Sequence, residues 1–351
     1  MSRLLLRHAS KPTPAPAELI SPKRITLGMR FLMSRLTFVT SVLEKDRAGM
    51  DHNLTMLDRL KIGWIGAGKM GGPMIRNLLR QGVSVAVTEP VTDTAAALVS
   101  AGATTAMSPT DHAQSDIVFA TVPNDQVLTA IIFGQGDMPG LAASLRRGAV
   151  FVEMSTVSPD CSARVAVALA DAGVAYLRAP LSGSTALAEQ ATLTILASGD
   201  KEAWAAAEPY LAVMSARRFY LGHGEEARYM KLVLNTLVGA TSAILAEALA
   251  LGEAGGLSRS AIMEVVSESA VASPLLKYKT GAIVANDFSP AFSVAQMIKD
   301  FTLINTAAVA HDVPQDVTGL ILQQYRDAAE AGLKDEDFFA LVKWRGGTLR
   351  D

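Results

Sequence analysis

The sequence predicts a two-domain α/β protein, with a mostly parallel β-sheet first and an all-α part after it. Half of its 351 residues are hydrophobic and 19% are charged, which is ample apolar material for a large buried core. From residue 61 to 221, short runs rich in Val and Ile alternate with longer segments rich in Ala and Leu, as in repeated βα units. Beyond residue 221 the strand pattern almost vanishes, which predicts helices.

In chain order, the predicted strands are 61–65, 83–87, 116–121, 149–153, 193–198 and 218–221. The predicted helices of the C-terminal part are 225–254, 259–272, 293–310 and 314–331. Residues 232–251 are long enough to span a membrane, but Asn235 and Glu247 interrupt the apolar run at a high cost in lipid. We therefore expect a helix buried between domains or subunits, and no membrane partner.

Composition excludes several classes of function. The formal net charge is −2, which gives no electrostatic footprint for nucleic acid or an anionic membrane surface. The single cysteine, Cys161, rules out intramolecular disulfides and a cysteine metal cluster. The five histidines show no metal-ligand spacing, so we predict no metal site.

The N-terminus differs in charge from the rest. Residues 1–43 hold seven basic residues and one acid, and the segment KPTPAPAE favours an extended linker. We expect residues 1–58 to be a basic, disordered extension and residues 1–55 to be dispensable for catalysis. Later methionines, such as Met56, offer alternative translation starts. We therefore interpret this stretch as an unfolded or upstream-translated segment and expect a cytoplasmic protein. The alternative is the mitochondrial matrix, because an Arg-rich and acid-poor segment is typical of a presequence.

A glycine motif follows the first predicted strand and opens a helix: Gly66, Ala67, Gly68, Lys69, Met70 and Gly71. In such a loop the first glycine permits a tight turn, the second lets the backbone approach a pyrophosphate, and the third allows close packing of helix on strand. The motif in this context predicts a Rossmann-type dinucleotide-binding domain over residues 59–221. An all-α domain would follow over residues 222–351, joined by a long interdomain helix. A flavin would use the same loop, so the glycines alone leave FAD open.

Glu89 lies at the end of the second predicted strand, where an acid can accept hydrogen bonds from the adenosine ribose. Its charge would repel a 2′-phosphate, and no Arg or Lys occurs from residue 83 to 101 to bind one. We therefore predict NAD as cofactor, in preference to NADP.

Four further motifs follow in a fixed order: EMSTVSP (153–159), APLSGSTALAEQATLTILASGD (179–200), KLVLN (231–235) and FSPAFSVAQMIKD (288–300). With the glycine loop GWIGAGKMGGPM, they make residues 61–346 resemble the β-hydroxyacid dehydrogenases. This is the 3-hydroxyisobutyrate dehydrogenase group, which is related to 6-phosphogluconate dehydrogenase. The resemblance implies oxidation of a small 3-hydroxy acid to its semialdehyde, or the reverse reduction, with hydride transfer to a nicotinamide. We also expect a homodimer or homotetramer.

The resemblance implies that Lys231 is the general acid and base and that Asn235, one turn later on the same helix face, binds substrate. Desolvation and the positive nicotinamide would lower the pKa of this lysine toward working pH. Substrate contacts would come from Ser155, Thr156, Ser182, Gly183 and Ser184. Cofactor contacts beyond the glycine loop and Glu89 would come from Val122, Pro123, Thr156 and Lys299. Ser158 and Pro159 also read as an N-cap and first residue of a helix.

Four residues depart from the family pattern. Ser184 stands where a second glycine is usual, Arg178 where an Asp usually precedes Ala-Pro, and Glu225 and Ala227 replace glycines before the lysine. We expect these departures, above all Arg178 and Ser184, to affect which substrate is used. The alternatives to a hydroxy acid dehydrogenase are an imine reductase-like enzyme and a non-catalytic dinucleotide-binding scaffold. The presence of Lys231 and Asn235 favours the dehydrogenase.

Overall fold

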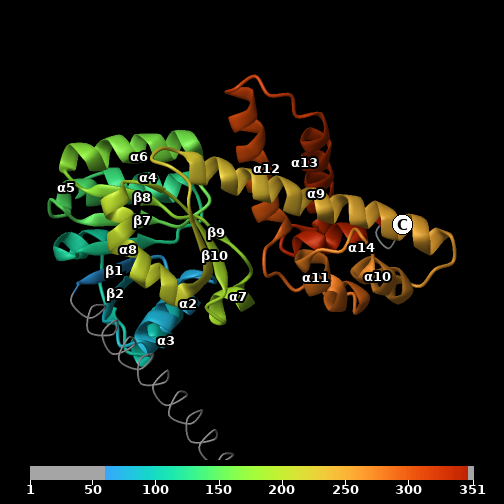
Figure 1. Ribbon diagram of the computed structural model, residues 1–351, viewed down its shortest axis with the longest axis horizontal. Helices are drawn as coiled ribbons and strands as arrows, with labels where there is room; N and C mark the ends of the chain where they lie inside the picture. Colours follow the sequence, from blue (N-terminus) through green and yellow to red (C-terminus); the bar gives the residue numbers. More distant parts are fainter. Residues whose placement is uncertain (1–59, 347–351) are drawn as a thin grey trace, which may run out of the picture. The chain divides into compact units, whose positions relative to one another are not determined.

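A nine-stranded, mostly parallel sheet forms the first part of the computed structural model, which describes residues 60–346 (Figure 1). The strands follow the order β11-β10-β8-β7-β4-β1-β2-β3, and β9 pairs with β10. Their bounds are β1 Ile62–Ile65, β2 Val85–Thr88, β3 Thr104–Thr105, β4 Ile117–Ala120, β7 Val150–Glu153, β8 Ala175–Arg178, β9 Leu181–Ser182, β10 Leu193–Gly199 and β11 Ser215–Tyr220. Two short strands, β5 Gly134–Gln135 and β6 Met138–Pro139, form a separate hairpin.

All six predicted strands are confirmed, within three residues of their predicted ends. Strand β8 was not predicted. It is a short run ending in the charged Arg178, and only the fold shows that this charge is buried. Strand β1 pairs with β2, and β4 pairs with β7, in the parallel sense. Strands β8 and β9 each pair with β10 in the antiparallel sense.

Helices cover both faces of the sheet. On one face, apolar side chains of α2 (Gly71–Arg80), α3 (Thr92–Ser100) and α8 (Lys201–Met214) join those of the strands in one core. On the other face the core includes α4 (Asp125–Phe133), α5 (Leu141–Ser144) and α6 (Pro159–Ala172). Strands buried on both faces explain why β1, β4 and β7 are apolar without alternation, apart from the buried Glu153 at the end of β7. The predicted start of α6 is confirmed, since Ser158 accepts a hydrogen bond from Cys161 N and Pro159 is the first helical residue.

The second part is all-helical. It contains α9 (Glu226–Ala254), α10 (Arg259–Glu268), α11 (Pro274–Val284), α12 (Val294–Val309), α13 (Asp316–Ala328), α14 (Leu341–Arg345) and short turns of other helix types between α13 and α14. The four predicted helices are present. The prediction for 259–272 extended too far, because α10 ends at Glu268, and α11 was not predicted. Pro274 starts a separate helix capped by Ser273.

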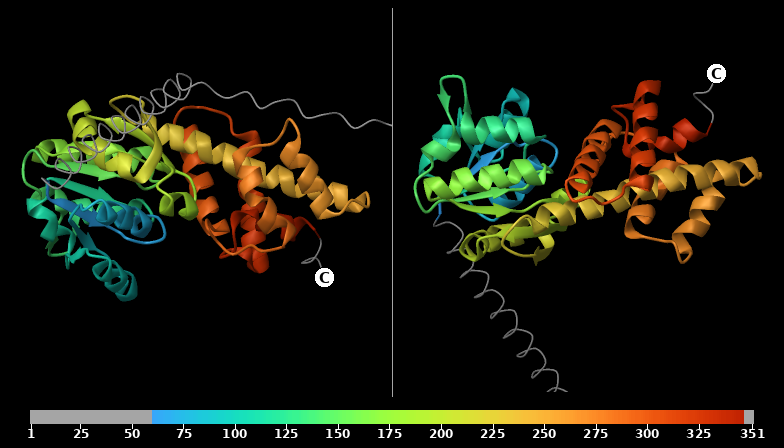
Figure 2. Two further views of the ribbon diagram at one scale, coloured as in Figure 1. Left: turned by 60° about the horizontal axis from the view of Figure 1, so that its bottom comes forward. Right: turned by 90° about the horizontal axis from the view of Figure 1, so that it is seen from above.

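Helix α9 leads from the sheet into the helical part (Figure 2). By length and composition it is the one helix within residues 60–346 that could cross a membrane. Its buried residues pack into the same core as α12, α13 and α14, and that core accounts for much of its apolar sequence. The predicted domain boundary at residues 221 and 222 falls between β11 and α9. The predicted extension over residues 1–58 lies outside the described residues.

Candidate functional site

The glycine loop joins β1 to α2 with the geometry that the motif predicts. Gly66 has a φ of +83°, and a Cβ there would lie 2.3 Å from the carbonyl oxygen of Thr121. A Cβ on Gly71 would lie 2.3 Å from the carbonyl oxygen of Gly66. At Gly68, by contrast, an added Cβ would meet nothing within 4 Å. Gly66 and Gly71 are therefore required by the fold, whereas Gly68 leaves open space in which a phosphate could approach the backbone.

The side chain of Trp64 on β1 holds this loop by hydrogen bonds, which the glycine motif alone does not predict. Its buried indole Nε1 donates to the carbonyl oxygen of Gly66 at 3.0 Å and lies 3.0 Å from Thr121 Oγ1. The Thr121 hydroxyl also donates to Gly66 O. The Gly66 turn is thus held by side chains of two neighbouring strand ends.

This difference between the glycines gives a matched pair of variants. Gly68→Ala should keep the wild-type Tm but weaken NADH binding by about tenfold, because the new methyl group occupies the space open to a phosphate. Gly71→Ala should instead lower Tm, because its methyl group collides with backbone. Thermal melting and NADH fluorescence titration separate the two effects. Equal NADH affinity for Gly68→Ala and wild type would contradict the assignment.

Glu89 lies against the glycine loop. Its Oε2 accepts a hydrogen bond from Ala67 N at 2.6 Å, and its Oε1 accepts one from Val91 N at 2.9 Å. Both carboxylate oxygens are therefore fixed at the end of β2, beside the first turn of the loop. This is the position at which an acid can receive ribose hydroxyl groups.

The strand ends of β4 and β7 meet at the same edge of the sheet. Val122 N donates to Ser155 Oγ at 2.7 Å, so the predicted cofactor segment after β4 and the predicted substrate segment after β7 are joined directly. Lys299 Nζ donates to Thr156 O at 2.7 Å and to Pro123 O at 3.4 Å. Helix α12 thereby brings Lys299 to both segments. Ser155 is buried and Thr156 is partly exposed, so Thr156 is the more accessible of the two.

Lys231 and Asn235 lie one turn apart on α9, next to this edge. Asn235 is buried and its Nδ2 donates to Asp300 Oδ2. Asp300 is fully buried, and its Oδ1 lies 3.0 Å from Lys299 Nζ. The structure thus brings Lys231, Asn235, Lys299 and Thr156 into one site. It adds Asp300, the last residue of a sequence motif, for which no role was predicted.

Lys231 is partly buried, and its burial and two neighbouring charges determine the direction in which its pKa is shifted. Burial lowers the pKa of Lys231 below its ordinary value; the charge of Asp300 raises this pKa, and that of Lys299 lowers it. The balance favours the neutral amine more than at an exposed lysine. A neutral amine can accept a proton, and its ammonium form can return one.

The predicted turn at Ser182, Gly183 and Ser184 begins at the last residue of β9, which packs against α9. Gly183 has a φ of +141°, and a side chain there would collide with Leu193. The Ser184 hydroxyl accepts a 3.4 Å hydrogen bond from Leu187 N at the start of α7 (Thr185–Glu189). Its oxygen therefore caps the first turn of α7, and among residues 60–346 its hydroxyl proton has no hydrogen-bond acceptor.

A buried polar cluster lies beneath the site, and its ion pairs were not predicted from the sequence. Glu153 and Arg228 form an ion pair in which both side chains are almost completely buried. A second pair joins Arg178 on β8 to Glu225 just before α9. Glu153 ends an otherwise apolar strand, and this acid in a buried run is the sequence signal that could have revealed the cluster.

The second pair corrects an expectation. Arg178 was expected to affect substrate choice, but its side chain is buried and pairs with Glu225. Its guanidinium carbon lies 4.6 Å from the centroid of the Tyr176 ring. The two departures from the family pattern are therefore partners. The negative charge of Glu225 before α9 neutralises the positive charge of Arg178 on β8, and an unpaired charge at this buried place would be costly.

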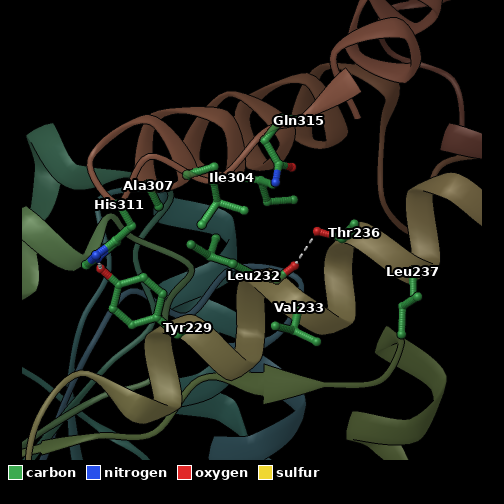
Figure 3. Close-up of a pocket in the computed structure, with 11 residues that line it drawn as sticks. Tyr229, Leu232, Val233, Thr236, Leu237, Ile304, Ala307, His311 and Gln315 are labelled. Atoms are coloured by element: carbon green, nitrogen blue, oxygen red, sulfur yellow. Dashed lines mark hydrogen bonds between the residues drawn. The ribbon is translucent and has the colours of Figure 1, made fainter. Parts of the chain in front are cut away.

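A cavity of about 640 Å³ lies between α9 and the second half of α12 (Figure 3). Its walls are mostly apolar, from Leu232, Val233 and Ile304 among others, and the Tyr229 hydroxyl lies 2.6 Å from His311 Nε2 at one end. The predicted site residues do not line it. Within residues 60–346, moreover, no group of three His, Cys, Asp or Glu side chains is placed to hold a metal ion.

Comparison with known proteins supports the fold, a parallel-sheet domain followed by a helical domain. A family model described as the NAD binding domain of 6-phosphogluconate dehydrogenase matches residues 61–222. One described as the NAD-binding of NADP-dependent 3-hydroxyisobutyrate dehydrogenase matches residues 225–345. The chain is 33% identical over 286 residues to 2-(hydroxymethyl)glutarate dehydrogenase of Eubacterium barkeri, a match that covers 81% of this chain and 94% of that protein.

Two further relatives extend the comparison. NAD-dependent L-serine dehydrogenase of Pseudomonas aeruginosa is 32% identical over 291 residues, covering 81% of this chain and 97% of the relative. Among solved structures, 3-hydroxyisobutyrate dehydrogenase from Salmonella typhimurium superimposes with a TM-score of 0.74 at 26% identity. That match covers 81% of this chain and 99% of the other.

Proposed function

The chain belongs to the β-hydroxyacid dehydrogenase family, and from this premise we propose that it oxidises a small 3-hydroxy acid to its semialdehyde, or catalyses the reverse reduction. It is an NAD(P)-dependent oxidoreductase acting on a CH–OH group. The observation that carries the substrate proposal is the convergence of Lys231, Asn235, Lys299 and Thr156 at the carboxyl ends of β4 and β7.

The chain's own residues divide the work. Lys231 takes the hydroxyl proton in oxidation and returns it in reduction, a role that is favoured because burial lowers its pKa below that of an ordinary lysine. Asn235 is held by Asp300 through its amide nitrogen. The second N–H of the same amide nitrogen is left to donate to a substrate oxygen, and this neutral group does not repel a carboxylate. The turn at residues 182–184 supplies backbone N–H and hydroxyl donors for the carboxylate.

The residues present fit a dinucleotide. The open space at Gly68, the positive φ of Gly66 and the fixed carboxylate of Glu89 would receive its diphosphate and ribose. Ala67, Lys69, Met70, Val122, Pro123, Thr156 and Lys299 complete the proposed cofactor contacts. When bound, the nicotinamide supplies the hydride acceptor for oxidation and the donor for reduction.

A substrate panel tests the proposal. Rates for a series of 3-hydroxy acids and their semialdehydes, each with NAD(H) and NADP(H), should show turnover that requires a carboxylate and a 3-hydroxyl or 3-oxo group. Matched 2-hydroxy acids and simple alcohols of equal length serve as controls. Turnover of cyclic imines without turnover of any hydroxy acid would contradict the proposal and support an imine reductase.

We propose NAD as the preferred cofactor because of Glu89. Glu89→Arg should lower kcat/KM with NAD and raise it with NADP, changing the ratio by at least about tenfold, because a carboxylate that repels the 2′-phosphate is replaced by a cation. Glu89→Gln is the matched control, which removes repulsion without adding attraction. A wild-type enzyme that already uses NADP better than NAD would overturn the assignment.

The expectations for the N-terminus remain proposals. A shortened chain that begins at Met56 should retain wild-type kcat and KM, because β1 begins only at Ile62. Activity assays and melting curves of both chain lengths test this, and loss of soluble enzyme would show that residues 1–55 are needed for folding. A cytoplasmic location and a homodimeric or homotetrameric state are likewise proposed, and imaging and light scattering would test them.

A further inference from the structure

The guanidinium of Arg228 connects three elements beneath the site. It pairs with Glu153 at the end of β7, donates from Nη1 to Ser155 O at 2.8 Å and donates from Nη2 to the Tyr176 hydroxyl at 3.1 Å. Its Nε donates to Ser162 Oγ on α6 at 3.2 Å. With 1% of its surface exposed, this side chain has no access to solvent. Only a planar group with several fixed donors can satisfy all these acceptors together.

Two cations from two helices bind consecutive carbonyl groups of the turn after β7. Arg228 on α9 donates to Ser155 O, and Lys299 on α12 donates to Thr156 O at 2.7 Å. Glu153 also holds this turn, because its Oε1 accepts a hydrogen bond from Ser155 N at 2.7 Å. The turn that presents Thr156 is therefore fixed to the helix that carries Lys231.

Arg228 precedes Lys231 by three residues, so the two side chains lie on adjoining positions of one helix face. Any rotation or shift of the first turn of α9 would move Lys231 relative to Thr156. We propose that Arg228, held by Glu153, is a positioning residue that fixes Lys231 against the turn at Ser155 and Thr156. The inference rests on the proposed function, because it concerns the residue to which that proposal assigns the proton transfer.

The neighbouring pair offers a matched control. Arg178 and Glu225 also join the sheet to the start of α9, and Arg178 Nε donates to the same Ser162 hydroxyl at 3.1 Å. Among the contacts of the described residues, however, none joins this pair to Ser155 or Thr156. If burial of an ion pair alone mattered, variants of either pair would behave alike.

Arg228→Lys keeps the charge but cannot reach all the acceptors. We expect its kcat to fall about tenfold and its NADH affinity to fall by less, because Thr156 in the loosened turn is one of several proposed cofactor contacts, whereas misplacing a reacting group costs rate directly. Glu153→Gln should also lower kcat, because it removes the charge that holds the Arg228 guanidinium. Arg178→Lys should lower Tm about as much as Arg228→Lys does, but its kcat should stay within about twofold of wild type. The double variant Glu153→Gln with Arg228→Met removes both charges and keeps the volume, so it should fold even if a single variant does not.

A second measurement does not need turnover. Competitive acetylation of the holoenzyme with acetic anhydride over a pH series, followed by peptide mass spectrometry, reports the pKa of Lys231 directly. In wild type this pKa should be low, and in Arg228→Lys and the double variant it should move toward the ordinary lysine value as water reaches a loosened first turn. In Arg178→Lys it should stay low.

The outcomes separate the two proposals. Unchanged kcat and an unchanged Lys231 titration in Arg228→Lys and the double variant would show that Arg228 is structural only. A loss of activity in Arg228→Lys no greater than that in Arg178→Lys would also show that its role is structural. If wild type turns over no hydroxy acid, the proposed function fails, while the acetylation series still decides whether Arg228 positions Lys231.

Discussion

Lys231→Met should reduce kcat for the best hydroxy acid by about 10² to 10⁴-fold, the usual loss when a general acid-base group is removed. Methionine keeps most of the aliphatic length and removes the amine, so the packing of α9 should survive. Tm should stay the same or rise, because a cation in a desolvating position is removed. NADH affinity, from fluorescence titration, should change little.

The pH profile gives an independent test of the same residue. Oxidation needs the neutral amine, so kcat for the hydroxy acid should rise with pH through the lowered pKa of Lys231. Reduction needs the ammonium and should fall over the same range. Lys277→Met, an exposed lysine that pairs with Glu268 on α10, is the control and should keep both limbs. A Lys231→Met enzyme with near-normal kcat and the wild-type pH limbs would remove Lys231 from the mechanism.

Much of the sheet could be predicted because local sequence and fold agree there. Strands buried on both faces are continuous apolar runs, and Gly66 and Gly71 stand where backbone geometry leaves no room for a side chain. Lys231 and Asn235 could be paired because a one-turn spacing on a helix is a local property. These features need no knowledge of distant contacts.

The buried charges could not be predicted in this way. Glu153 in an apolar run indicates a buried acid, but nothing in the local sequence shows that its partner is Arg228, 75 residues away, or that Arg178 and Glu225 neutralise each other. An Arg taken alone reads as a surface group or a substrate ligand, and only the fold shows its desolvation and its partner. Strand β8 was missed for the same reason, since its last residue is a charge that the fold buries.

Asp300 and Lys299 should tune Lys231 in opposite directions. The charge of Asp300 raises the pKa of Lys231, so Asp300→Asn should lower that pKa further and move the rising limb of oxidation to lower pH. The charge of Lys299 lowers the same pKa, so Lys299→Gln should move this limb to higher pH, although Gln can still donate to Thr156 O.

Asp300→Asn should also cost up to about 10²-fold in kcat, because Asn235 loses the charged acceptor that fixes its amide and a displaced substrate contact is costly. Asn235→Ala is the matched variant, because it removes the oriented amide and keeps the charge of Asp300. It should lower kcat without the acid shift of Asp300→Asn. Complete profiles of kcat against pH for the three variants therefore separate orientation from electrostatics, since only a change in charge at residue 299 or 300 should displace the limb. Limbs that coincide with wild type in both charge variants would mean that the titrating group is not Lys231.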